Sequence, residues 1–267
     1  MKYKIIAFDI DDTLLNTKKQ LTPATEKALL NAQSEGIKLV VASGRLPYGV
    51  RPFAERLKVL ENNGYYMGFN GGAVLNSRGE LISTTYLDSK YIEPIYDVLR
   101  PLNITTMVHK GDVIYRDRKV NEYTHIETEA VGLPLNPVDD IARFVDWDIH
   151  KFLLAGDPEL LKQTEKVLLE KFGGEVDIYL SAPWFLEVMP KGINKGIGLE
   201  KICLDCGVAM DEVIAFGDSF NDIPMIQKAG LGVAMGNAEE ELKAVADYVT
   251  ESCDNDGIAA ALDRFLV

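Results

Sequence analysis

Residues 2–16 read KYKIIAFDIDDTLLN, an apolar run from Ile5 to Phe8 that leads directly into three aspartates, Asp9, Asp11 and Asp12. A continuous apolar run is typical of a strand that is buried on both faces of a parallel sheet. Aspartates crowded at the end of such a strand are unusual, because each carboxylate raises the free energy of ionising its neighbours. The stretch therefore predicts a buried strand, and it raises the question of whether the three carboxylates share one role.

The alternation of apolar strands and amphipathic helices continues in the first third of the chain and returns at its end. Residues 22–36 are predicted to form a helix with Thr22 as its cap and Pro23 at its first position, followed by an apolar strand at 37–43. Near the end of the chain, the apolar segment 212–218 lies between two helical segments. This alternation predicts an α/β fold, a doubly wound parallel sheet covered by helices on both faces.

The middle of the chain has a different pattern. Residues 105–109 and 112–117 indicate a hairpin, and helices and strands follow them in mixed order. Such an order indicates an α+β unit inserted between the two halves of an α/β core. The predicted organisation is an inserted cap at 84–188 within a core formed by residues 1–83 and 189–267.

The composition is that of a soluble globular protein with a sizeable core, at 47% hydrophobic and 26% charged residues. The formal net charge of −13 argues against nucleic acid or an anionic membrane as a partner, because both are polyanionic. No apolar run reaches the length that spans a bilayer, and the first residues do not resemble a signal peptide. Three cysteines form no disulfide framework. We therefore expect a cytoplasmic protein whose partner is a small molecule.

Polar residues follow three of the predicted strands, at the point where each strand ends. They are Asp9 and Asp11 after the first strand, Ser43, Gly44 and Arg45 after the second, and Asp218 near the end of the chain. Lys195 lies where the chain re-enters the core and begins a helix. Ligands of open parallel sheets bind beyond the carboxyl ends of the strands, so we expect these residues to meet at one edge.

These residue types suit phosphoryl transfer. Several carboxylates without a cluster of His or Cys favour Mg²⁺ as the cofactor. Asp9 could attack a phosphate if the metal and Lys195 offset the repulsion between the two anions, while Ser43 donates to the phosphoryl oxygens. Asp11 could protonate the leaving oxygen and later activate water. The sequence thus favours two steps through an aspartyl-phosphate, although each residue taken alone could be a turn, cap or surface residue.

Four short segments resemble, in order and placement, the four motifs of the haloacid dehalogenase-like phosphatases. They are DIDDTLL at 9–15, SGR at 43–45, NKG at 194–196 and GDSFND at 217–222. Two more segments, FNGG at 69–72 and AMGNA at 234–238, resemble the Cof-type branch, subfamily IIB, whose cap is an α/β insert between the second and third motifs. The likeness covers essentially the whole chain.

The resemblance implies a role for each motif residue. Asp9 would be the nucleophile and a Mg²⁺ ligand, and Asp11 the acid/base, with its backbone carbonyl also on the metal. Ser43 would hold the transferring phosphoryl group, Lys195 would neutralise it, and Asp218 would complete the metal site. The remaining residues that we assign to the site are Asp222 at the metal, and Gly44, Arg45, Asn70 and Asn221 at the substrate. Asn221 and Asp222 could also orient Lys195 or metal-bound water.

Several assignments have alternatives. Arg45 could pair with an acidic neighbour, Asn70 could form only a turn, and Asn237 is interpreted as a helix cap. The three histidines, which lie in the insert without the spacing of metal ligands, are predicted to be structural or surface residues. Asp12 stands where the family usually has glycine, so we predict that it is a turn residue.

The sequence as a whole predicts a Mg²⁺-dependent phosphatase whose cap closes over small phosphorylated metabolites. Sugar phosphates are the substrates that the family resemblance implies. The alternatives are a phosphomutase, which needs the same aspartates, and a non-catalytic sensor of a phosphorylated ligand. Asp11 argues against a sensor, because binding alone requires no acid/base beside the nucleophile.

Overall fold

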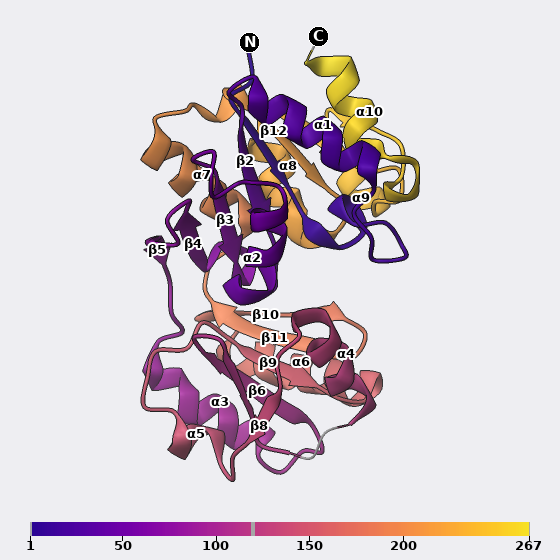
Figure 1. The fold of residues 1–267 in the computed structure, drawn as a ribbon. Helices are drawn as coiled ribbons and strands as arrows, with labels where there is room; N and C mark the ends of the chain where they lie inside the picture. Colours follow the sequence, from indigo (N-terminus) through magenta and orange to yellow (C-terminus); the bar gives the residue numbers. More distant parts are fainter. Residues whose placement is uncertain (1, 119–120, 267) are drawn as a thin grey trace. The chain divides into compact units, whose positions relative to one another are not determined.

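A computed structural model describes residues 2–118 and 121–266 of the chain. The chain folds into two units (Figure 1). Unit 1 comprises the described residues up to Thr84 and from Asn194 onward, and unit 2 is Thr85–Ile193. The return to unit 1 lies after Ile193, later than the predicted boundary after residue 188. The reason is that the last strand of unit 2 stays paired as far as Pro190.

Unit 1 contains an eight-stranded sheet with the order β14-β13-β12-β1-β2-β3-β4-β5. Its strands are β1 (Ile5–Phe8), β2 (Lys38–Ala42), β3 (Tyr65–Gly68), β4 (Ala73–Asn76), β5 (Leu81–Thr84), β12 (Val213–Gly217), β13 (Leu231–Ala234) and β14 (Tyr248–Val249). The six strands from β14 to β3 are parallel, and β4 and β5 are antiparallel additions at the edge. This sheet confirms the predicted α/β core.

The helices of unit 1 cover its sheet. They are α1 (Pro23–Ser34), α2 (Pro47–Arg56), α7 (Lys195–Cys206), α8 (Ile223–Lys228), α9 (Glu240–Lys243) and α10 (Gly257–Phe265). As predicted, α1 has Thr22 as its cap, whose hydroxyl accepts from the Thr25 amide at 3.2 Å. α1 packs on α10, and α7 packs on α8. All four residues of β1 are 0% exposed, so both faces of the sheet are covered.

Short helical turns connect several of these elements. They are Ile10–Leu14, Phe69–Gly71, Met210–Glu212, Phe220–Asp222 and Cys253–Asn255 in unit 1, and Ser89–Tyr91 in unit 2. Three of them, Ile10–Leu14, Phe69–Gly71 and Phe220–Asp222, follow strands of the sheet and contain residues assigned to the site.

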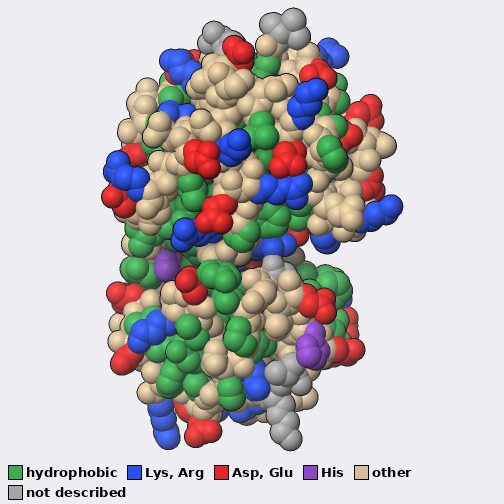
Figure 2. Space-filling view, viewed as in Figure 1, with side chains coloured by type: hydrophobic (Ala, Val, Ile, Leu, Met, Phe, Trp, Pro, Cys, Tyr) green, Lys and Arg blue, Asp and Glu red, His purple; other side chains and the backbone are tan. Residues whose placement is uncertain are grey.

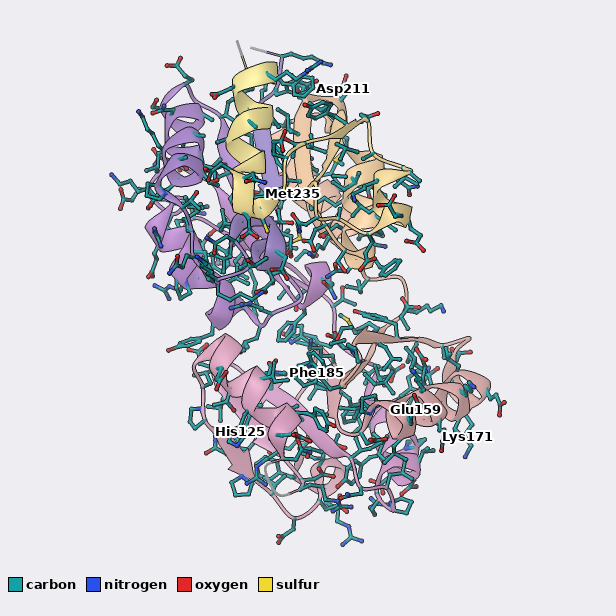
Figure 3. All side chains as sticks on the ribbon, turned by 90° about the vertical axis from the view of Figure 1, so that its right-hand side faces the viewer. His125, Glu159, Lys171, Phe185, Asp211 and Met235 are labelled. Atoms are coloured by element: carbon teal, nitrogen blue, oxygen red, sulfur yellow. The ribbon has the colours of Figure 1, made fainter. Side chains whose placement is uncertain are left out.

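Unit 2 is an α+β unit with a six-stranded sheet in the order β10-β11-β9-β6-β7-β8. Its strands are β6 (Thr105–Lys110), β7 (Val113–Arg116), β8 (Leu135–Pro137), β9 (Phe152–Ala155), β10 (Val176–Ala182) and β11 (Phe185–Pro190). Its helices are α3 (Ile92–Leu99), α4 (Glu122–Val131), α5 (Ile141–Phe144) and α6 (Pro158–Phe172). β6 and β7 form the predicted hairpin. Glu159 and Lys171, labelled in Figure 3, lie in the first and last turns of α6.

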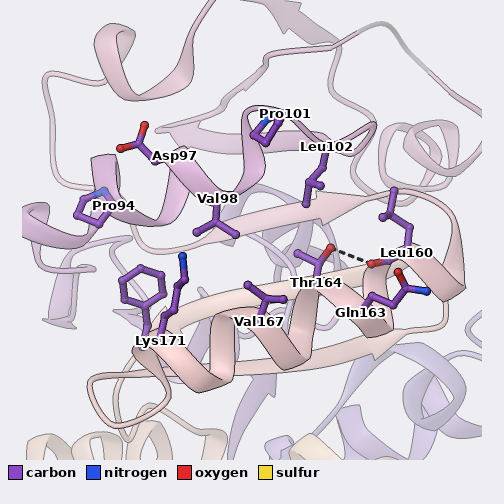
Figure 4. A pocket seen from close by; sticks show the side chains of 11 residues that line it. Pro94, Asp97, Val98, Pro101, Leu102, Leu160, Gln163, Thr164, Val167 and Lys171 are labelled. Carbon is purple, nitrogen blue, oxygen red and sulfur yellow. Dashed lines mark hydrogen bonds between the residues drawn. The ribbon is translucent and has the colours of Figure 1, made fainter.

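A groove of about 700 Å³ lies between α3 and α6 in unit 2 (Figure 4). Its walls are largely apolar, with Val98 on α3 and Val167 on α6, and it contains no residue assigned to the site. Within the described residues, none of the helices has the length and apolar character of a bilayer-spanning segment. In the view of Figure 2, acidic and basic side chains are interspersed over the surface of unit 1.

Candidate active site

Three adjacent parallel strands of unit 1 end at the site. β12, β1 and β2 lie side by side in register. Asp218, Asp9 and Ser43 each follow the last residue of one of these strands. Because parallel strands end at the same edge of a sheet, the topology brings these three side chains together. The buried apolar strands thus position the polar groups that follow them.

The chain after β1 turns sharply at Asp12. Asp9 is in an extended conformation, with its amide donating to the Phe216 carbonyl at 3.2 Å. Asp12 has φ of 57°, in the left-handed region that glycine adopts most readily. Its carboxylate lies 3.2 Å from the ammonium of Lys19. The structure therefore confirms that Asp12 is a turn residue.

Lys195 begins α7 and points its ammonium into a fully buried site. Its Nζ lies 2.5 Å from Asp9 Oδ1 and 2.6 Å from Asp222 Oδ1, and the side chain is 0% exposed. Asn194 caps the helix, its side-chain oxygen accepting from the Ile197 amide at 3.0 Å. A Cβ on Gly196 would lie 2.5 Å from the Pro224 carbonyl, so only glycine lets α7 approach α8 this closely.

The loop after β12 folds around the carboxylate of Asp222. Asp222 Oδ2 accepts from the amides of Asp218 and Ser219, at 3.1 Å each, while its Oδ1 faces Lys195. Thr13, from the turn after β1, donates to Asp218 Oδ1 at 2.6 Å. Asp222 therefore holds both the loop and the lysine, and Thr13 fixes the orientation of Asp218.

The carboxylates form a candidate Mg²⁺ site. Oxygen atoms of Asp9, Asp218 and Asp222 all lie within 4.8 Å of one another. A set of carboxylate oxygens is the donor type that Mg²⁺ prefers, so the residues fit the predicted cofactor. The fourth predicted ligand, Asp11, was assigned through its backbone carbonyl, and its side chain is paired with Arg45.

The electrostatics of the site also favour a cation. Burial raises the pKa of Asp9 well above its usual range, and the negative charges of Asp222 and Asp218 add to this, while Lys195 opposes it. Burial and the charge of Asp222 raise the pKa of Asp218 to about 7, although the hydrogen bond from Thr13 lowers it. Carboxylates whose ionised forms are disfavoured in this way bind a divalent cation that supplies the missing charge.

Lys195 remains charged in this site. Burial alone would lower the pKa of its ammonium, but the carboxylates of Asp222 and Asp9 outweigh burial and raise the pKa. The cation beside the nucleophile is therefore permanent at neutral pH.

Asp11 has a different environment from Asp9. Arg45 donates to its carboxylate through Nε at 2.9 Å and Nη2 at 2.8 Å, a two-point ion pair. Burial would raise the pKa of Asp11, but the hydrogen bond and charge of Arg45 outweigh it and lower the pKa. The sequence left open whether Arg45 contacts the substrate or pairs with an acidic neighbour. In the structure it pairs with Asp11. Asp11 is ionised in this arrangement.

The remaining predicted residues surround Ser43. Ser43 is 2% exposed, and its hydroxyl accepts from the Arg45 amide at 3.2 Å. Asn70 is 4% exposed, and its backbone amide donates to the Ser43 carbonyl at 3.0 Å. Asn221 Nδ2 donates to Asn70 Oδ1 at 3.0 Å. The structure thus brings the second and fourth motifs into contact through Asn70.

Two site residues were not anticipated correctly. Thr13 lies within the first motif at 9–15, but it was assigned no role from the sequence. The interpretation of Asn237 as a helix cap is wrong, because α9 begins after Glu239. Instead, the side chain of Asn237 donates through Nδ2 to the Asp12 carbonyl at 2.8 Å, and its Oδ1 accepts from the Cys253 backbone amide at 2.8 Å. It therefore ties the turn after β1 to the C-terminal segment.

Known proteins share this fold over nearly the whole chain. A solved structure of a haloacid dehalogenase-like hydrolase from Bacteroides thetaiotaomicron has a TM-score of 0.92 and 34% identity, over 98% of this chain and 99% of that one. The HAD subclass IIB sugar phosphatase BT4131 has a TM-score of 0.86 and 26% identity, over 98% of both chains. The 5-amino-6-(5-phospho-D-ribitylamino)uracil phosphatase YcsE of Bacillus subtilis is 31% identical, over 99% of this chain and 96% of that protein.

The fold, the acidic site and these relatives together define a phosphatase. Residues 6–262 match the model of the haloacid dehalogenase-like hydrolase family. The chain belongs to this family, in its Cof-type subclass IIB branch, as the motif resemblance implied.

Proposed function

We propose that the chain is a Mg²⁺-dependent phosphatase that hydrolyses small phosphorylated metabolites, in particular sugar phosphates, through an aspartyl-phosphate on Asp9. The observation that carries this proposal is the buried ammonium of Lys195, 2.5 Å from Asp9 and 2.6 Å from Asp222. A bare carboxylate repels a phosphate dianion, and a fixed cation beside it offsets that repulsion. This arrangement supports a carboxylate that attacks phosphorus rather than one that only binds.

The first step forms the covalent intermediate. A carboxylate oxygen of Asp9 attacks phosphorus, and the bond between phosphorus and the leaving oxygen breaks. Ser43 and Lys195 donate to the phosphoryl oxygens, and Asp11 gives a proton to the leaving oxygen. Asp11 is ionised and bound to Arg45 in the structure, so it must exchange Arg45 for the leaving group and take up a proton beforehand.

The second step releases phosphate. Asp11, now a carboxylate, accepts a proton from water, whose oxygen attacks the phosphorus of the intermediate. The bond between phosphorus and Asp9 breaks, and the carboxylate is regenerated. Asp9, Asp218 and Asp222 would hold the Mg²⁺, which when bound supplies positive charge that neutralises the phosphoryl oxygens.

The substrate class is supported by the relatives and by charge. One relative is a sugar phosphatase, and the other acts on a phosphorylated ribityl compound. The net charge of −13 opposes binding of a polyanion such as nucleic acid. We further propose that unit 2 acts as the substrate-specificity cap and that the enzyme works in the cytoplasm, where its three free cysteines stay reduced.

The test is a screen of the purified protein against phosphorylated metabolites, with Mg²⁺ and with EDTA. Phosphate release is expected with Mg²⁺, and it is expected to disappear in EDTA and in Asp9→Asn. Asp12→Gly is a matched control, because it changes a neighbouring aspartate that has no proposed catalytic role. Activity that survives Asp9→Asn or EDTA would contradict the mechanism. Phosphate transfer that requires a bisphosphate activator would identify a phosphomutase instead.

A further inference from the structure

The turn after β3 has a backbone conformation that side chains rarely adopt. Phe69, Asn70 and Gly71 have consecutive positive φ values of 52°, 53° and 90°. Glycine adopts this region freely and asparagine tolerates it, but for a bulky residue such as phenylalanine it is a genuine outlier. Phe69 and Asn70 are also buried, at 3% and 4% exposed. Strain of this kind persists only where surrounding contacts hold it in place, and it concentrates at functional sites.

The turn is held first by the loop that carries Ser43. The backbone amide of Phe69 donates to the Arg45 carbonyl at 2.8 Å, and the backbone amide of Asn70 donates to the Ser43 carbonyl at 3.0 Å. These two bonds fix the backbone on both sides of Gly44. A Cβ on Gly44 would lie 3.2 Å from Asn70 Oδ1, so the asparagine side chain packs directly on this loop.

The turn also packs against the start of α7, which carries Lys195. A Cβ on Gly71 would lie 2.7 Å from the Asn194 carbonyl, and a Cβ on Gly198 would lie 2.9 Å from the Cα of Gly71. The two backbones therefore meet without a side chain between them. The turn is therefore in direct backbone contact with the first turn of α7.

The third contact reaches the loop after β12. Asn221 Nδ2 donates to Asn70 Oδ1 at 3.0 Å, and the next residue, Asp222, holds Lys195 at 2.6 Å. The Asn70 side chain thus bonds to the loop that carries Asp222 and packs on the loop that carries Ser43, while the next residue, Gly71, lies against the helix that carries Lys195.

We propose that Asn70 is a positioning residue, which fixes Ser43, Lys195 and Asp222 relative to one another and does not contact the substrate. This replaces its assignment to substrate binding, and it rests on the proposed function insofar as those residues carry the reaction. The strained backbone is then explained as the conformation in which two consecutive residues, Asn70 and Gly71, reach all three motifs at once.

The test is Asn70→Gly, which removes the side-chain amide but leaves a residue that adopts the observed φ without strain. Asn63→Gly is the matched control, because exposed Asn63 has a similar φ of 55° in the loop before β3. We expect kcat of Asn70→Gly to fall about 10–100-fold, the loss that follows from misplacing catalytic groups by about 1 Å. KM is expected to stay within about threefold of wild type, since the substrate loses no direct contact. Asn63→Gly is expected to leave both constants unchanged.

Two results would overturn the proposal. An unchanged kcat would show that the amide positions nothing, and a rise in KM at constant kcat would show that Asn70 binds substrate. Crystal structures of wild type and Asn70→Gly provide a readout that does not depend on activity. We expect Ser43 Oγ or Lys195 Nζ to move by roughly 1 Å, and superimposable positions would refute the positioning role. If the wild type released no phosphate from any substrate, the proposed function would fail while this comparison still decided the role of Asn70.

Discussion

Lys195 carries a buried charge whose removal is costly to the folded protein. Its ammonium is 0% exposed and lies 2.5 Å from Asp9 and 2.6 Å from Asp222. Lys195→Met keeps an unbranched side chain of similar length but leaves two buried carboxylates without their cation. Removing one partner of a buried ion pair costs about 3–5 kcal/mol, because the remaining charge is uncompensated. Each kcal/mol lowers Tm by about 2–4 °C in a domain of this size, so we expect a fall of ~6–20 °C in the Tm of unit 1.

The assay is calorimetric unfolding in EDTA, so that no divalent cation takes the place of the lysine. Lys228→Met is the matched control, since Lys228 lies 2.6 Å from Glu200 but the two side chains are 36% and 41% exposed. A surface pair of this kind contributes about 0–1 kcal/mol, and its loss is expected to change Tm little. If Lys195→Met unfolded at the same temperature as Lys228→Met, the argument that burial makes the loss of the Lys195 ion pairs strongly destabilising would be refuted. We also expect Lys195→Met to release no phosphate.

Three further predictions concern single side chains. Asp12→Gly is expected to keep turnover within about a few fold of wild type, because glycine adopts the left-handed backbone there without strain. A loss of turnover as large as that of Asp11→Asn would contradict this. Thr13→Val removes the hydroxyl that orients Asp218 and is expected to weaken Mg²⁺ affinity about 10–100-fold, measured by titrating activity with the metal; an unchanged affinity would refute that role. Burial, followed by the charges of Lys151 and His150, lowers the pKa of His109 to about 3. Below pH about 6.5 only the unfolded state takes up this proton, so stability falls as pH decreases, by about 1.4 kcal/mol per pH unit. In His109→Gln that slope is expected to be shallower by this amount between about pH 6.5 and 4.5, and an identical slope would contradict the assignment. Both tryptophans lie in unit 2, so their fluorescence reports its unfolding.

The parts of the fold that the sequence predicted are those that local pattern determines. Apolar runs such as Ile5–Phe8 predicted buried parallel strands, and their ends predicted where Asp9, Ser43 and Asp218 would meet. These residues meet because the carboxyl ends of parallel strands lie at the same edge of a sheet. The prediction of an α+β insert rested in the same way on a local hairpin pattern.

Contacts between distant segments could not be predicted in this way. The bond from Asn237 to the Asp12 carbonyl joins residues 225 positions apart, and nothing in the local sequence shows which carbonyl an asparagine will reach. The same holds for Asn70, whose interpretation stayed open because its role depends on Ser43, Asn221 and α7 together. The predicted boundary near residue 188 falls within a strand whose pairing extends to Pro190, and that pairing is also a long-range property.

The three aspartates after β1 show how one residue type acquires different roles through its neighbours. Each carboxylate lies closest to a different cation: Lys195 at 2.5 Å from Asp9, Arg45 at 2.8 Å from Asp11, and Lys19 at 3.2 Å from Asp12. Lys19 also lies 3.6 Å from Asp11. Their side chains are 10%, 40% and 43% exposed, in the same order. The interactions therefore weaken from the first to the third, because solvent screens the exposed pairs. The crowding of charge is tolerated because it is shared among three cations, and the buried pair is the one on which catalysis is proposed to depend.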